Sequence, residues 1–95
     1  MLRIVARMSI APDKIDEALV VVKELIAETL QEEGCADYSF CKDVGDADSY
    51  AMLETWETPE AADRHGKSEH FTRLAPQLGA LQQGEGQMSV YQVLI

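Results

Sequence analysis

The spacing of hydrophobic residues changes several times along this chain, and the order of those changes limits the folds it can adopt. Residues 2–9 follow a period of two with β-branched members, which is typical of a strand. Over 15–30 the apolar residues recur at helical spacing, which predicts a long amphipathic helix. Pro12 is expected to set the start of this helix, and Gly34 to form its left-handed C-terminal cap.

The alternating pattern returns after Gly34. We expect a second strand at 37–44, a hairpin turn at 45–48 and a third strand at 49–57. Another alternating stretch at 87–95 predicts a last strand. On the third strand, alternation separates a bulky set from a small set, and we expect the small set to pack under the helices. The bulky set, expected on the opposite face, is Tyr50, Met52, Glu54 and Trp56, and the small set is Ala51, Leu53 and Thr55.

Two helical pieces are expected between the third and last strands. Thr58 is placed to cap a short helix that starts at Pro59 and runs to Arg64 or His65. The chain should break near Gly66, and a further helix is expected over 68–78, opened by Ser68.

These elements predict one α+β domain over residues 1–95. Their order, β-α-β-β-α-β, indicates the ferredoxin-like arrangement, a four-stranded antiparallel sheet with helices on one face. The other face would be bare in so small a monomer. We therefore expect a homodimer that covers the open sheet face, as in a dimeric α/β-barrel.

The composition argues against several classes of binding partner. The formal net charge is −9 and the sequence pI about 4.5, so the surface repels nucleic acids and anionic lipids. No apolar run is long enough to span a bilayer, and the N-terminus lacks the pattern of a secretory signal. Cys35 and Cys41 lack C-x-x-C spacing, which argues against a disulfide framework or a zinc site and favours a cytoplasmic location.

Residues 54–71 hold the only tryptophan and both histidines of the chain, and alternative interpretations exist for each. Trp56 is either core or a binding platform. Glu54, if buried, needs a partner, and Arg7 on the neighbouring strand is the candidate for a structural or a functional ion pair. His65 and His70 either cap the helix break or line a pocket, where a histidine can act as acid or base. A metal site is disfavoured, because Gly66 interrupts the helix between the two histidines.

The same stretch, E-x-W-x-T-P-E-A-x-x-x-H-x-x-S-x-H-F, resembles the signature of the antibiotic biosynthesis monooxygenase superfamily. Residues 4–7, 12–14 and 32–35 resemble its first strand, its helix start and the Glu-Glu-Gly-Cys segment before its second strand. The resemblance covers the whole chain and is greatest to the quinol monooxygenase-like branch. The heme-degrading branch fits poorly, because its asparagine, tryptophan and histidine fall on Arg7, His65 and Ala75.

The resemblance implies a cofactor-independent monooxygenase that oxidises a small quinol or polyhydroxylated aromatic with dioxygen, without metal. The residues expected to take part in catalysis are His65 for proton removal, Arg7 for charge stabilisation and Glu54 for positioning. The residues expected to bind the ring are Trp56, His70, Phe71, Val5 and Tyr50.

Two other functions stay open at this point. One is an isomerase or degradative enzyme for a small phosphorylated carbonyl compound such as phospho-autoinducer-2, which would need a cationic pocket. The other is a non-catalytic barrel that binds a small molecule.

Overall fold

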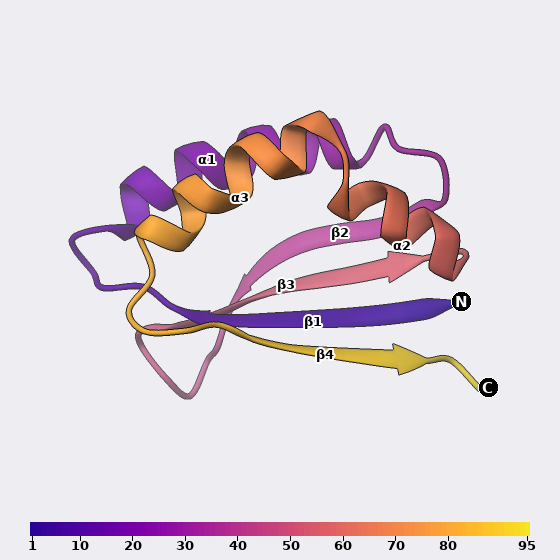
Figure 1. Ribbon diagram of the computed structural model, residues 1–95. Helices are drawn as coiled ribbons and strands as arrows, with labels where there is room; N and C mark the ends of the chain where they lie inside the picture. Colours follow the sequence, from indigo (N-terminus) through magenta and orange to yellow (C-terminus); the bar gives the residue numbers. More distant parts are fainter.

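A four-stranded antiparallel sheet with helices on one face forms the protein (Figure 1). The computed structural model describes residues 1–95. The strands are β1 (Leu2–Ser9), β2 (Cys35–Lys42), β3 (Ser49–Trp56) and β4 (Gln87–Gln92), and the helices are α1 (Ile15–Thr29), α2 (Pro59–Gly66) and α3 (Glu69–Ala80). The strand order β2-β3-β1-β4 confirms the predicted ferredoxin-like α+β fold. The predicted broken helix is the pair α2 and α3.

The ends of α1 differ from the prediction. Pro12 lies in a turn before the helix, which begins at Ile15. At the other end the chain leaves the helix through tight bonds, in which Gln31 and Glu32 donate to the carbonyls three residues earlier. Gly34 does have a left-handed backbone, with φ +85°, but it lies in the turn before β2 and does not cap the helix. The helix has already ended when the chain reaches it.

The two predicted N-caps are confirmed. Thr58 accepts a hydrogen bond from the Ala61 amide at 3.1 Å, and Ser68 accepts one from the Phe71 amide at 3.3 Å. These caps fix where α2 and α3 begin, and the short connection between the helices lets the chain turn sharply after Gly66.

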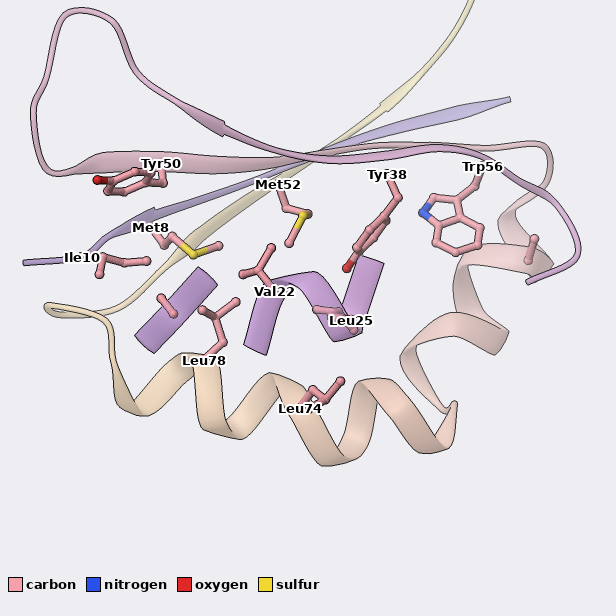
Figure 2. Packing of buried hydrophobic residues seen from close by; sticks show 12 residues of the cluster. Met8, Ile10, Val22, Leu25, Tyr38, Tyr50, Met52, Trp56, Leu74 and Leu78 are labelled. Atoms are coloured by element: carbon pink, nitrogen blue, oxygen red, sulfur yellow. The ribbon is translucent and has the colours of Figure 1, made fainter. Parts of the chain in front are cut away.

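The two faces of β3 are the reverse of the prediction. The bulky set from Tyr50 to Trp56 is buried beneath the helices, as Figure 2 shows for Tyr50, Met52 and Trp56. The small set lies on the face turned away from the helices, which we call the open face. Large side chains are needed to fill the space between a sheet and helices to normal density, so size was the wrong argument for placing small residues there.

The buried core lies between the sheet and the helices. Trp56, Ile10 and Leu25 are among its largest fully buried side chains, and Val22 and Leu74 of α1 and α3 pack in the same layer (Figure 2). β4 is covered less well, since Met88 and Val90 are 68% and 53% exposed. The edge of the sheet at β4 therefore opens beside α2.

No helix of the chain combines the length and the apolar character needed to cross a membrane.

Candidate functional site

A cavity of about 380 Å³ opens between the sheet and the helices, at the end of the sheet where α2 lies. Its walls come from β1, β3 and β4 below and from α2 and the start of α3 above. The lining residues are Leu2, Ile4, Glu54, Pro59, Ala62, Asp63, His65, Gly66, Phe71, Met88 and Val90. Most of these are apolar, none is a lysine or an arginine, and the volume suits a small organic molecule.

Glu54 supplies a buried carboxylate to this cavity. It is 7% exposed, and the indole Nε1 of Trp56 donates to its Oε1 at 2.9 Å. Burial raises the pKa of the Glu54 carboxyl above its ordinary value; the Trp56 hydrogen bond opposes this rise and the charge of Glu32 adds to it. A carboxylate in such a place is a stronger base than one in water.

Behind the cavity wall, one carboxylate joins both histidines of the chain. Nδ1 of His65 donates to Oε2 of Glu32 at 2.6 Å, and Nε2 of His70 donates to the same oxygen at 2.7 Å. The Tyr38 hydroxyl donates to Nε2 of His65 at 3.3 Å. We call Glu32, His65 and His70 the histidine cluster. Both ring nitrogens of His65 therefore have partners inside the protein.

Burial also sets the charge of His65. The whole residue is 5% exposed. This burial lowers the pKa of His65, although the hydrogen bond and the charge of Glu32 pull the pKa upward. The neutral imidazole fits the observed contacts, with its proton on Nδ1 and its Nε2 accepting from Tyr38. The contact between His65 and Glu32 is therefore a hydrogen bond from a neutral ring to a carboxylate.

Aromatic rings surround His65 and hold its orientation. The ring centroids of Trp56 and Phe71 both lie 4.8 Å from that of His65, and that of Tyr38 lies 5.2 Å away. Trp56 itself is fully buried and does not line the cavity. It acts on the cavity through its hydrogen bond to Glu54 and its contact with the His65 ring.

The structure brings together some of the residues expected in the site and separates others. Glu54, His65 and Phe71 line one cavity. Trp56 and His70 lie one layer behind it, in contact with Glu54 and with Glu32.

Three expected residues lie elsewhere. Arg7 pairs in register with Ala51, on the open face, whereas Glu54 pairs with Ile4 on the helix face. The predicted ion pair between Arg7 and Glu54 is therefore wrong, because the sheet separates the two side chains; Arg7 instead donates to Ser89 Oγ at 3.2 Å. Val5 also lies on the open face, since its partner in β3 is Leu53.

Tyr50 is on the helix face but at the opposite end of β3 from Trp56. Its ring stacks on Phe40, with centroids 5.4 Å apart and planes within 5°. Two smaller hollows, of about 150 and 230 Å³, lie at that end beside Arg7 and the hairpin loop. Neither includes Glu54, Trp56 or a histidine.

Sequence reasoning missed Glu32 as a site residue, along with Tyr38. A signal was present, since histidines next to a helix break need hydrogen-bond partners when they are covered, and the Glu-Glu-Gly-Cys segment precedes the strand that carries Tyr38. The histidine cluster also contains donor atoms that could hold a metal ion, since one ligand atom from each residue lies within 4.8 Å of the others.

Comparison with known proteins agrees with this fold. The family model described as "Antibiotic biosynthesis monooxygenase" matches residues 1–77. The protein YcnE of Bacillus subtilis (strain 168), whose name proposes a monooxygenase, is 32% identical over 66 residues, which are 70% of each chain.

Solved structures extend the likeness over the whole chain. A conserved protein from Methanosarcina mazei Go1 has a TM-score of 0.93 and 34% identity, with 96% of this chain and 90% of that chain covered. An antibiotic biosynthesis monooxygenase crystal structure has a TM-score of 0.91 and 34% identity, with both chains fully covered. The chain belongs to the antibiotic biosynthesis monooxygenase family.

Proposed function

We propose that the protein is a cofactor-independent monooxygenase that oxidises a small quinol or polyhydroxylated aromatic with dioxygen. One observation carries the proposal: the buried carboxylate of Glu54 faces an otherwise largely apolar cavity. Such a carboxylate can take a proton from a phenolic hydroxyl. The family membership supports the reaction class.

The chemistry needs only the substrate, dioxygen and a base. Glu54 accepts the hydroxyl proton, so the negative charge passes to the ring and the charge within the cavity stays constant. The electron-rich anion gives one electron to dioxygen, and the resulting ring radical and superoxide combine to form a C–O bond. The O–O bond of the peroxide then breaks, the ring carbon loses its proton, and a hydroxyquinone and one water leave. The atoms balance, because one oxygen of dioxygen stays on the ring while the other leaves as water with two hydrogens taken from the quinol.

The apolar walls help this reaction by keeping water away from the anion. An anion in a dry site is less stabilised than in water, so it gives up an electron more readily. Phe71 lines the same cavity and offers an aromatic face or edge to the substrate ring. In this arrangement Glu54 is the base, since both nitrogens of His65 are already bonded to Glu32 and Tyr38.

The phosphorylated carbonyl compound finds less support in the cavity. A phosphate needs cationic or backbone donors around it, and the lining contains two carboxylates, Glu54 and Asp63, and no lysine or arginine. Arg7, the cation that was expected nearby, lies across the sheet. A neutral substrate that becomes an anion by giving its proton to Glu54 suits this electrostatic environment better.

Oxygen consumption against a panel of quinols and polyhydroxylated aromatics, with a metal chelator present, tests the proposal. We expect uptake with at least one compound and expect the Glu54→Gln variant to lose at least about 100-fold in kcat, the lower end for general-base catalysis. The glutamine keeps the shape and can still accept from Trp56. Glu57→Gln is the matched control, since Glu57 is exposed and lies outside the cavity.

Two results would contradict the proposal. Unchanged turnover in the Glu54→Gln variant would show that Glu54 is not the base. Oxygen uptake that the chelator abolishes would contradict a cofactor-free mechanism. Thermal stabilisation by a quinone without any oxygen uptake would instead indicate the non-catalytic binding barrel.

We further propose that a second copy of the chain covers the open face and the edge at β4. Tyr91 of β4 pairs with Arg3 on the open face and is 53% exposed, and Leu94 and Ile95, which follow β4, are almost fully exposed. Burial of such a patch favours self-association. Light scattering coupled to size exclusion should give twice the chain mass of 10.5 kDa, and Tyr91→Lys should shift the mass toward the monomer. A wild-type monomer at micromolar concentration would refute the dimer.

A further inference from the structure

The histidine cluster has the donor set of a metal site, and its parts come from two distant segments. Glu32 belongs to the turn after α1, His65 to the last turn of α2 and His70 to the first turn of α3. The break between α2 and α3, which argued against a metal site at the sequence level, is what turns both rings toward one carboxylate oxygen. We propose that Glu32, His65 and His70 bind a divalent transition-metal ion such as Zn²⁺.

The fold fixes the two segments against each other. Gly34, two residues after Glu32, is packed so closely on α2 that a Cβ there would lie 2.6 Å from Cβ of Ala61. On the other side, Ser68 donates to the carbonyl of His65 at 2.7 Å and caps α3. The backbone that carries each donor is thus held before any ion arrives, which lowers the cost of binding.

The donor types select a class of ion. Two imidazole nitrogens and one carboxylate oxygen suit Zn²⁺, Co²⁺, Ni²⁺ or Fe²⁺ better than Ca²⁺ or Mg²⁺, which prefer oxygen ligands. Three protein ligands leave at least one position for water. The cluster is also nearly dry, because the side chains of His65, His70 and Glu32 are 7%, 12% and 15% exposed.

The distances between the donor atoms must change by a small amount when an ion binds. Zinc bonds of about 2.0–2.1 Å at tetrahedral angles place ligand atoms about 3.3 Å apart, whereas the two histidine nitrogens lie 2.6 and 2.7 Å from the Glu32 oxygen. An ion therefore lengthens these two N–O distances by about 0.6–0.7 Å. It also draws the two nitrogens, which lie up to 4.8 Å apart, toward the same separation of about 3.3 Å. Such a movement is within the range of a side-chain rotation.

The second nitrogen of His65 has a partner ready for it. When the ion binds Nδ1, the ring proton moves to the nitrogen that does not bind the ion. For His65 that nitrogen is Nε2, which already faces the Tyr38 hydroxyl at 3.3 Å; the hydroxyl oxygen can then accept the ring N–H. Metal-binding histidines commonly have a hydrogen-bond acceptor at this second nitrogen.

The test is metal binding by the full chain after chelator treatment and dialysis. We expect one Zn²⁺ per chain by calorimetry, visible absorption bands on Co²⁺ addition, and Zn²⁺-dependent thermal stabilisation. Because the chain has only two histidines, long-range ¹H–¹⁵N spectra can identify the ligand atoms. Zn²⁺ should shift Nδ1 of His65 and Nε2 of His70.

Variants show whether Zn²⁺ binds at the histidine cluster or at neighbouring side chains. Glu32→Gln and His70→Gln should each weaken Zn²⁺ binding at least about tenfold, since even partners of metal ligands contribute that much. Glu33→Gln, at the neighbouring carboxylate outside the cluster, should leave the affinity unchanged, and so should Cys35→Ser. Circular dichroism without metal shows whether each variant is folded, and using two cluster variants keeps the test valid if one unfolds.

The proposal is overturned if millimolar Zn²⁺ leaves both histidine spectra unchanged, or if Cys35→Ser abolishes binding while Glu32→Gln does not. None of these measurements depends on oxygen uptake. The metal site can therefore fail while the proposed monooxygenase activity stands, and the reverse also holds.

Discussion

Replacing Gly34 by alanine should destabilise the protein more than an ordinary glycine substitution, for two separable reasons. The backbone of Gly34 has φ +85°, and an L-residue held in the left-handed region costs about 1–2 kcal/mol. The added methyl group would also lie 2.6 Å from Cβ of Ala61, which is 1% exposed and cannot retreat. Overpacking of this kind costs about 1–3 kcal/mol, so the Gly34→Ala variant should lose about 2–5 kcal/mol of unfolding free energy.

Gly84 provides a matched control within the same chain. Its backbone is also left-handed, with φ +70°, but a Cβ built there meets nothing within 4 Å. The Gly84→Ala variant should therefore lose only the conformational part, about 1–2 kcal/mol. Urea unfolding followed by far-UV circular dichroism measures both losses, provided that the m-values stay equal.

A double-mutant cycle isolates the contact with α2. The Ala61→Gly variant alone should lose about 1 kcal/mol, because glycine is a poor helix former. Combined with Gly34→Ala it removes the clash, so the double variant should be more stable than the sum of the single losses predicts, by about 1–3 kcal/mol. Equal losses for Gly34→Ala and Gly84→Ala, or strict additivity in the cycle, would refute the claim that Gly34 is required for its close approach to α2.

Three further predictions concern individual groups. Glu54→Gln should raise the melting temperature at pH 7–8, because burial raises the pKa of Glu54 and the folded wild type must hold a buried charge above that pKa. The gain in melting temperature should vanish below pH 4.5, the ordinary pKa of a glutamate, where the carboxyl is protonated in both the folded and the unfolded chain. A gain that does not change with pH in a thermal-unfolding series would contradict this. The pKa of His65 should lie below 6.5 in an NMR titration. The stability that the neutral His65 ring contributes is then present above pH 6.5 and is lost as the pH falls through the native pKa. A native pKa above 6.5 would contradict this, because His65 would then stabilise the protein at low pH. Thr58→Ala should lower the unfolding free energy measured in urea by about 1 kcal/mol, because the α2 cap is lost, and Thr58→Ser should keep most of that free energy. An equal loss in both variants would show that the hydroxyl does not cap the helix.

Local signals in the sequence were enough to find the elements of the fold. Thr58 and Ser68 are followed by amides that they cap, and each begins a helix where expected. The loop after β2 closes through side chains as its composition suggests, since Asp43 and Asp46 accept from the amides of Gly45 and Asp48. Each of these interactions spans only a few residues, so a pattern in the chain can report it.

The local pattern of residues does not show which face of the sheet the helices cover. Alternation along β3 shows that Glu54 and Trp56 share a face, and this is correct, but it does not say which face the helices cover. The assignment depended on an argument from side-chain size, which failed. Because Arg7 was then placed opposite Glu54, a single reversed face also produced the wrong ion pair. The register, which puts Ile4 beside Glu54, settles the matter only once the sheet is assembled.

The histidine cluster shows why the site was harder to foresee than the fold. Glu32 meets His65 and His70 across separations of 33 and 38 residues, and no local pattern encodes such a meeting. What brings them together is the tight approach of Gly34 to Ala61, which itself depends on a glycine with left-handed geometry. His65 is part of both the cavity and the histidine cluster, since its ring lines the cavity while its nitrogens bind Glu32 and Tyr38. An ion bound to the cluster would therefore act on the cavity through the position of one ring, without entering the cavity, and Glu54 would remain the group that receives the substrate proton.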